Sequence, residues 1–356
     1  MSADLKHVKS IYGGYWKYKI NDFCYLVNPY FPTDKMIKEM KKNMDKLIRN
    51  YPSTNITISE TLSNTIKIPK ENIAVANGAS ELIAIFGQLF VKSISVYVPT
   101  FDEYINRLKI QNKKVHIYET IDNDFQLNLD DFIRSIKTTK SNTALLIRPN
   151  NPTGMHITKK DAIYCLEKLS EVDHVIVDES FVDMVTIESN TSIEDQLKTF
   201  DNLVIIKSLS KSYGTPGLRL GYLLANKDIT SVVRTNLPIW NINSFSQFFL
   251  EIFDKYKKDY FQSCKKMVEV TNNLYNNLLN ISYITPYPTQ ANFILCKLNG
   301  YTSAELSAIL FKKYNILVND SSSKKGLDNR FIRISSRTEE ENQTLVATLK
   351  KIGEKK

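Results

Sequence analysis

Short apolar runs alternate with amphipathic segments through the middle of the chain. The apolar runs are rich in β-branched residues and predict strands over residues 94–98, 115–118, 144–147, 174–177, 203–207 and 220–225. Apolar positions at helical spacing predict helices over residues 80–90, 101–111, 129–136 and 159–169. Continuous apolar strands between amphipathic helices indicate an α/β fold with a mostly parallel sheet covered on both faces.

The pattern changes after Pro238. The elements predicted there are long helices over 245–279, a strand at 292–296, a helix at 303–314, strands at 316–318 and 331–334, and a helix at 339–352. This change predicts a second, smaller α+β unit.

The composition limits the function classes. With 356 residues, of which 42% are hydrophobic and 24% charged, the chain has an ordinary globular balance and room for two domains. The most apolar stretch, residues 82–91, is too short to span a membrane, so we expect no membrane segment. The polar first ten residues lack a secretory-signal pattern, which predicts the cytoplasm. The four scattered cysteines and four histidines show no metal-ligand spacing, so we expect reduced thiols and no metal site.

The net charge of +9 raises the question of a nucleic-acid partner. The lysines are mixed with Asp and Glu along helical stretches such as residues 35–46 and 255–266. That mixture favours a solvated basic face, so we expect no nucleic acid. Only nine of the 47 basic residues are arginine. In a chain that mostly uses lysine, the few arginines are candidates for sites where the planar guanidinium binds a carboxylate or a phosphate through two hydrogen bonds.

Polar segments directly follow four of the predicted strands. They are Pro-Thr-Phe at 99–101, Pro-Asn-Asn-Pro-Thr-Gly at 149–154, Asp-Glu-Ser at 178–180 and Ser-Leu-Ser-Lys at 208–211. In an open parallel sheet, ligands bind beyond the carboxyl ends of the strands. The four segments therefore predict one shared site at that edge of the sheet.

Two residues of these segments carry the candidate chemistry. Lys211 follows a strand, where apolar surroundings lower its pKa and suit it to form a Schiff base with an aldehyde. Asp178 ends an apolar strand, where a carboxylate is costly unless it meets a positive partner. Pyridoxal phosphate needs both groups, because the lysine binds its aldehyde and the acid keeps its pyridine nitrogen protonated. We therefore predict Lys211 and Asp178 as the catalytic residues.

Further residues are placed to hold this cofactor. Its phosphate needs hydroxyls, a guanidinium fork and free N–H groups at a helix start, which we expect from Ser208, Ser210, Arg219, Gly78, Ala79 and Ser80. Phe101 is expected to stack on the pyridine face. Asn151 is expected to donate to the phenolic oxygen of the ring.

These motifs resemble those of the fold-type I pyridoxal-phosphate enzymes of the aminotransferase class I/II group, over residues 13–352. The segment 149–154, Asp178, and the run from Ser208 through Lys211 occur in the order of that family. The resemblance implies a large cofactor domain with a mostly parallel seven-stranded sheet between helices. Its implied boundaries are 36–265 for the large domain, and 1–35 with 266–356 for a small α+β domain that includes an N-terminal arm.

The resemblance also implies roles for single residues. In the family, the lysine that matches Lys211 carries the cofactor, and the arginine that matches Arg333 binds the substrate α-carboxylate. The residues that match Asp178 and Asn151 hold the cofactor ring. The tyrosine that matches Tyr51 reaches the cofactor phosphate of the partner subunit, which implies a homodimer with the active site at the interface.

Two members of the family share most with the chain, histidinol-phosphate aminotransferase and L-threonine-O-3-phosphate decarboxylase. The decarboxylase is similar in the segments 13–14, 22–23, 28–29, 178–183, 320–323 and 326–327 and in a pair of late arginines. Both relatives act on phosphorylated small molecules, so the resemblance implies a phosphate- or phosphonate-bearing substrate. The residues expected to bind it are Arg333, Arg337, Asn28 and Gly14.

The favoured activity is that of a pyridoxal-phosphate-dependent aminotransferase acting on a small amino donor and a keto-acid acceptor, with Lys211 as base and acid. The alternative activity is decarboxylation of a phosphorylated amino acid. The sequence does not choose between the two reactions, because the bond that breaks at Cα depends on sub-ångström placement of the substrate. A cofactor-sensing regulator of DNA would need a helix-turn-helix region, for which the first twenty-odd residues leave no room. One domain of a larger bifunctional enzyme, coupled to nucleotide transfer, stays open.

Three residues depart from the usual pattern of these relatives. Phe181 stands where many aminotransferases have a tyrosine that bonds the ring oxygen, so we expect a higher pKa for the Schiff base. Tyr12 stands where the decarboxylase has a histidine, which weakens the transfer of that activity. Arg148 precedes the Asn-Pro pair, an uncommon place for an arginine. It could add an anion contact, and we favour an outward-facing structural role.

Overall fold

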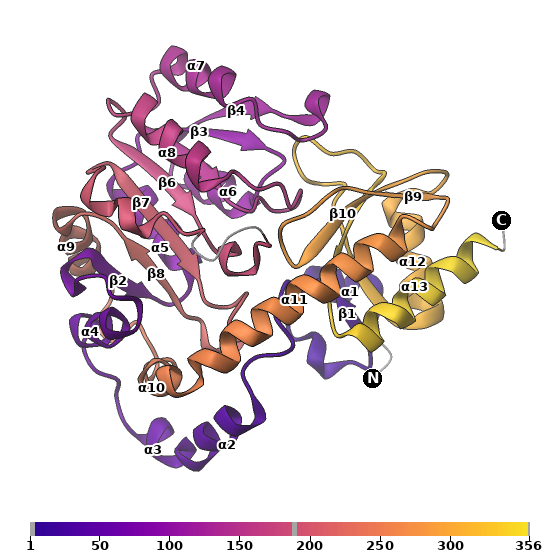
Figure 1. The fold of residues 1–356 in the computed structure, drawn as a ribbon, viewed down its shortest axis with the longest axis horizontal. Helices are drawn as coiled ribbons and strands as arrows, with labels where there is room; N and C mark the ends of the chain where they lie inside the picture. The colour runs from indigo at the N-terminus through magenta and orange to yellow at the C-terminus, as the bar shows by residue number, and fades with distance from the viewer. Residues whose placement is uncertain (1–3, 187–190, 355–356) are drawn as a thin grey trace.

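The computed structural model describes residues 4–186 and 191–354. Figure 1 shows two sheets, of which the larger is formed by the middle of the chain. Its seven strands lie in the order β2 (Ile73–Ala76), β8 (Gly221–Leu224), β7 (Leu203–Ser208), β6 (His174–Asp178), β5 (Thr143–Ile147), β3 (Ser93–Val98) and β4 (Lys114–Glu119). Strands β3 to β7 are parallel, and β8 is antiparallel to both of its neighbours. The predicted mostly parallel seven-stranded sheet is confirmed.

Helices cover both faces of the larger sheet. One face packs against α5 (Ala79–Leu89), α6 (Asp102–Ile110) and α9 (Lys227–Asn236). The other packs against α4 (Asn55–Ile66), α7 (Leu129–Thr139), α8 (Lys159–Lys168), α10 (Ser244–Phe253) and α11 (Lys257–Leu278). The short helices α2 (Asp34–Lys42) and α3 (Met44–Arg49) pack on α10. In β6, Val175 and Val177 face one layer of helices and Ile176 faces the other, which explains the continuous apolar runs.

The smaller sheet joins both ends of the chain. Its order is β1 (Asn21–Phe23), β11 (Ile316–Asp320), β12 (Phe331–Ser335), β10 (Phe293–Leu298) and β9 (Ile284–Pro286). It is accompanied by α1 (Leu5–Ser10), α12 (Ser303–Tyr314) and α13 (Glu339–Gly353). Helix α11 runs from α10, beside the larger sheet, to the smaller sheet, where it contacts β9 and α13 (Figure 1). Strand β1 pairs in parallel with β11, so the N-terminal segment belongs to this sheet. The domain boundaries at 36 and 265 stay a prediction.

The sequence pattern misses some elements of this fold. Strands β1, β2 and β9 have three or four residues each, too few for an alternation to be read. The predicted helical stretch 245–279 is interrupted by a 3-10 turn, Asp254–Tyr256, which separates α10 from α11. Within residues 4–186 and 191–354, every helix is too short or too polar to cross a membrane.

Candidate active site

A cavity of about 530 Å³ lies beyond the carboxyl ends of β5, β6 and β7. Its walls come from distant parts of the chain, including the N-terminal segment, the start of α5 and the turn after β3. The predicted site residues that line it are Lys211, Asp178, Asn151, Phe101, Ser208, Ser210, Arg219, Ala79, Ser80 and Gly14. They meet because the parallel strands end at the same edge of the sheet.

Lys211 lies three residues beyond the end of β7 and is half-buried. Its Nζ is 5.9 Å from the centre of the Phe181 ring, which lines the same cavity. Burial lowers the pKa of Lys211 from 10.5, and the charges of Arg333 and Arg219 lower it further, to about 8. Near that pH much of the amine is neutral and can attack an aldehyde.

Asp178 is the last residue of β6, and only 4% of it is exposed. One carboxylate oxygen accepts a hydrogen bond from the Tyr104 hydroxyl at 2.8 Å, and the other accepts one from the Ser180 N–H at 2.9 Å. Burial raises the pKa of Asp178, and these hydrogen bonds act against burial. A positive partner in the cavity, such as a protonated pyridine nitrogen, would offset the remaining cost of the buried charge.

The other end of the cavity is suited to a phosphate. Helix α5 begins directly after Gly78, so its first N–H groups are free to bind an anion. Nη1 of Arg219 lies 3.5 Å from Oγ of Ser210, and Ser208 lines the same end. A Cβ at residue 78 would lie 2.5 Å from Nη2 of Arg219, so the glycine leaves room for the guanidinium. The hydroxyls, the fork and the helix start form one anion site.

These residues fit pyridoxal 5′-phosphate as a group. The Lys211 amine suits its aldehyde, the Asp178 carboxylate suits its ring nitrogen, and the Arg219 end suits its phosphate. Phe101 lines the same cavity. The roles of the single residues remain predictions, and their placement in one cavity supports them.

Arg333 lies in β12 and is 7% exposed. Its Nη1 donates to Oδ1 of Asn151 at 2.5 Å, and its Nη2 donates to the carbonyl of Cys24 at 3.0 Å. This hydrogen bond fixes the orientation of the Asn151 amide, so its nitrogen can donate to a group in the cavity that Asn151 lines. The Nε of Arg333 is buried and has no hydrogen-bond partner among the described residues, so the guanidinium keeps a donor for a further anion.

Five predicted residues do not line this cavity: Gly78, which directly precedes α5, Arg333 in β12, and Asn28, Arg337 and Tyr51. Asn28 is 1% exposed and directs its side-chain amide to the carbonyl of Ser212, so the structure does not place it against a substrate. Arg337 lies 3.6 Å from Glu341 at the start of α13 and does not line the cavity. Tyr51 is 77% exposed and stacks on Trp240, with ring centres 4.3 Å apart.

Arg148 does not face outward, and that expectation is wrong. It is fully buried and forms an ion pair with Glu179, which is also fully buried. It also donates to the carbonyl of Ile157 at 2.9 Å and to that of Thr191 at 2.7 Å. A buried guanidinium needs such partners, because an unpaired charge in the interior is costly. The structural role of Arg148 stays a prediction.

Two residues near the cavity were missed by sequence reasoning. Tyr104 fixes the Asp178 carboxylate, and its place on α6 gives it no sequence signal beyond an apolar helix position. Lys324 lies in the loop between β11 and β12, where its Nζ is 2.5 Å from Asp102 and 3.4 Å from the carbonyl of Thr100. Burial lowers the pKa of Lys324, Asp102 opposes that shift, and the nearby Arg333 lowers the pKa further. The sequence segments that resemble the decarboxylase, 320–323 and 326–327, lie on either side of Lys324 and do not include it. Lys324 is a second cation in this region, beside Arg333.

The fold and the cavity fit the α/β class of pyridoxal-phosphate-dependent enzymes. The chain belongs to the family Aminotransferase class I and II, whose sequence profile matches residues 17–349. The predicted resemblance, fold and cofactor are thereby confirmed at the level of the family.

Several named proteins are similar to the chain. A CMP-5′-(3-aminopropyl)phosphonate synthase of Streptomyces rubellomurinus is 33% identical over 97% of this chain, which spans 55% of that protein's length. An L-serine phosphate decarboxylase of Campylobacter jejuni is 32% identical over 92% of this chain and 87% of its own length. A histidinol-phosphate aminotransferase of Methanococcus aeolicus is 32% identical over 91% of this chain and 88% of its own length.

The solved structures include a decarboxylase from Sulfurospirillum multivorans with a TM-score of 0.89 and 27% identity. The match covers 99% of this chain and 92% of that chain.

Proposed function

We propose that this chain decarboxylates a phosphorylated α-amino acid with the help of pyridoxal phosphate. The observation that carries the proposal is a pair of cations beside the cavity: Arg333 bonds to the lining residue Asn151, and Lys324 bonds to Thr100 and Asp102 on either side of the lining residue Phe101. Two cations suit a substrate with two anionic groups, a carboxylate and a phosphate. The name of the relative from Campylobacter jejuni, an L-serine phosphate decarboxylase, supports the same chemistry.

In this proposal the bound cofactor acts as an electron sink for the bond that breaks at the substrate Cα. Arg333 holds one anionic group of the substrate, and Lys324 holds the other in exchange for Asp102. The substrate carboxylate leaves as CO₂, and a proton takes its place on Cα. Lys211 lines the same cavity and would donate that proton.

A second candidate is aminotransfer, which the sequence motifs favour. The relative from Methanococcus aeolicus, a histidinol-phosphate aminotransferase, supports it with an identity similar to that of the decarboxylase. In that reaction Lys211 would take a proton from Cα as a base and deliver it as an acid to the cofactor carbon that carries the amino nitrogen. The same residues serve both reactions, and the orientation of the substrate decides between them.

The products of the holoenzyme distinguish the two reactions. The substrates to compare are phospho-L-serine, phospho-L-threonine, histidinol phosphate, 2-aminoethylphosphonate and aspartate. We expect CO₂ from a phosphorylated amino acid, no turnover in Lys211→Ala, and a KM raised about tenfold in Lys324→Met because one charge-assisted contact is lost. Formation of pyridoxamine phosphate without CO₂ would refute decarboxylation in favour of aminotransfer.

We also propose a homodimer. Tyr51 and Trp240 form an exposed stacked pair, and Ile48 and Ile239 nearby along the chain are 66% and 73% exposed. Exposed apolar clusters of this kind mark association surfaces, and a Tyr51 outside its own cavity suits the predicted contact with a partner's cofactor. Light scattering on the purified protein tests this, and a monomer at micromolar concentration would overturn it.

Two broader expectations stay proposals. The length of the phosphonate relative supports the idea that the chain works within a larger protein. A reducing cytoplasm stays the expected location.

A further inference from the structure

The backbone around Lys211 is held by residues that lie outside the cavity. The Lys211 carbonyl accepts from the N–H of Asn28 at 3.0 Å and from that of Gly214 at 3.1 Å. The Ser212 carbonyl accepts from Nδ2 of Asn28 at 2.9 Å, and the Ser212 hydroxyl donates to Asp183 at 3.0 Å. Asn28 is 1% exposed and Ser212 is fully buried, so water does not compete strongly for these bonds.

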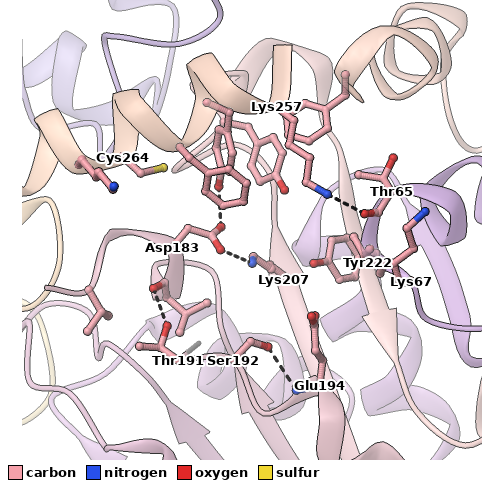
Figure 2. A pocket seen from close by; sticks show the side chains of 18 of the residues that line it. Thr65, Lys67, Asp183, Thr191, Ser192, Glu194, Lys207, Tyr222, Lys257 and Cys264 are labelled. Carbon is pink, nitrogen blue, oxygen red and sulfur yellow. Dashed lines mark hydrogen bonds and ion pairs between the residues drawn. The ribbon is translucent and has the colours of Figure 1, made fainter. Parts of the chain in front are cut away.

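Asp183 borders a second cavity of about 530 Å³, shown in Figure 2. Figure 2 shows Asp183 facing Lys207, with Oδ1 at 2.7 Å from Nζ. Its other oxygen accepts from the Tyr260 hydroxyl at 2.7 Å and from Ser212. Burial acts to lower the pKa of Lys207, but the charge and hydrogen bond of Asp183, together with Tyr213 and Glu179, outweigh burial and raise that pKa. Lys207 therefore stays charged and anchors the Asp183 carboxylate.

The direction of the hydrogen bonds follows from counting hydrogens. Tyr260, Ser212 and Asp183 form a triangle whose third edge, between the two hydroxyl oxygens, is 2.9 Å. Two hydroxyls carry two hydrogens, so two of the three edges are occupied at once. A carboxylate accepts and is charged, so both hydrogens are best given to Asp183. The Ser212 hydroxyl is thereby held in one orientation.

We infer that Asp183 is a positioning residue for the lysine: acting through Ser212, it holds one side of the turn from which Lys211 projects, while Asn28 holds the other. The inference rests on the proposed role of Lys211. The amine sits at the end of a flexible side chain of four methylene groups, so its aim depends on a fixed Cα. Asn28, Ser212 and Asp183 do not line the cavity that holds Lys211, so they would not contact a substrate bound there.

Ser212→Ala tests the link most directly, because it removes one hydroxyl and leaves the pair of Asp183 and Lys207 intact. In the apoprotein, we expect the amides of residues 211–214 to exchange with solvent about tenfold faster. We expect capture of pyridoxal phosphate, followed by absorbance, to slow by roughly 10- to 100-fold. The matched control is Tyr164→Phe, which removes a hydroxyl that donates to the carboxylate of Asp130 at 2.6 Å far from the lysine.

Asp183→Gly adds a rescue experiment. The second cavity adjoins the lost carboxylate, so added formate can occupy the place between Lys207 and Ser212. We expect formate, and chloride much less, to restore part of the slow exchange and of the capture rate. Should this variant fail to fold, Ser212→Ala decides alone.

Exchange and capture rates in Ser212→Ala equal to those of the wild type would overturn the inference, and so would faster exchange with unchanged capture. Neither measurement uses an amino-acid substrate. A failed decarboxylase assay would therefore refute the proposed reaction and leave this test standing.

Discussion

The half-buried amine of Lys211 should make the apoprotein less stable at neutral pH than at high pH. Its pKa is about 8 in the folded protein and 10.5 in the unfolded chain. Between these values the unfolded chain binds a proton that the folded protein does not bind, so stability rises with pH across this window. Below about pH 8 both states are protonated, and the full penalty for the buried charge applies.

The size of this penalty follows from the shift. A difference of about 2.5 units, at ~1.36 kcal/mol per unit, corresponds to ~3 kcal/mol. The side chain is only half-buried, so screening by solvent reduces this figure, and we expect ~1–3 kcal/mol. Lys211→Met keeps the length of the side chain and removes the charge. The variant should therefore be more stable than the wild type at pH 7 and lose that advantage near pH 10.5.

Thermal unfolding of the two apoproteins from pH 6 to 10.5 measures the effect. One kcal/mol corresponds to roughly 2 °C in Tm for a protein of this size, so the expected gain at pH 7 is about 2–6 °C. Comparing variants at each pH cancels the titration of other groups. Lys198→Met, at an exposed lysine, is the control and should show no such trend. A difference in Tm that is the same at pH 7 and pH 10.5 would refute the reasoning.

Three further outcomes follow from the geometry. Gly78→Ala should raise the Kd for pyridoxal phosphate about tenfold or more in a fluorescence titration, because the new Cβ would meet Arg219 and φ is +84° at this residue; an unchanged Kd would contradict it. Arg148→Met should lower stability by ~3–5 kcal/mol in thermal melts, since it leaves Glu179 buried and unpaired. Combining it with Glu179→Leu should recover much of that loss, and a double variant no more stable than the single one would exclude this account. Phe181→Tyr should lower the pKa read from the cofactor absorbance of the holoenzyme, because its hydroxyl can donate to the ring oxygen, and an unshifted titration would count against this role.

The elements of the larger sheet were largely predictable. Its long strands are buried on both faces, so each is written as an apolar run that local pattern reading detects. The segments after β5, β6 and β7 carry polar residues. These segments lie at the same edge of the sheet because the three strands are parallel. Short strands such as β1 and β2 were missed, because their pairing partners lie far away in the chain.

The contacts of single charged and polar residues were harder to predict. Arg148 was expected at the surface because a charged residue is usually exposed. Its buried partner Glu179 directly follows β6, the strand that pairs with β5, and the sequence does not show that pairing. Lys324 and Arg333 come close because the loop between β11 and β12 reaches the turn after β3. Neither contact leaves a periodic pattern in the sequence.

The sequence by itself determined the α/β class, the family and the presence of Lys211 and Asp178 at the ends of two strands, because local patterns and short motifs encode these features. The tertiary structure alone decided what surrounds the lysine. Asn28 is 184 residues from Ser212, and Asp183 and Lys207 belong to different segments, yet all of them meet behind the same turn. Such contacts arise only when distant segments fold together, and so do the burial and the charges of Arg333 and Arg219 that lower the pKa of the Lys211 amine.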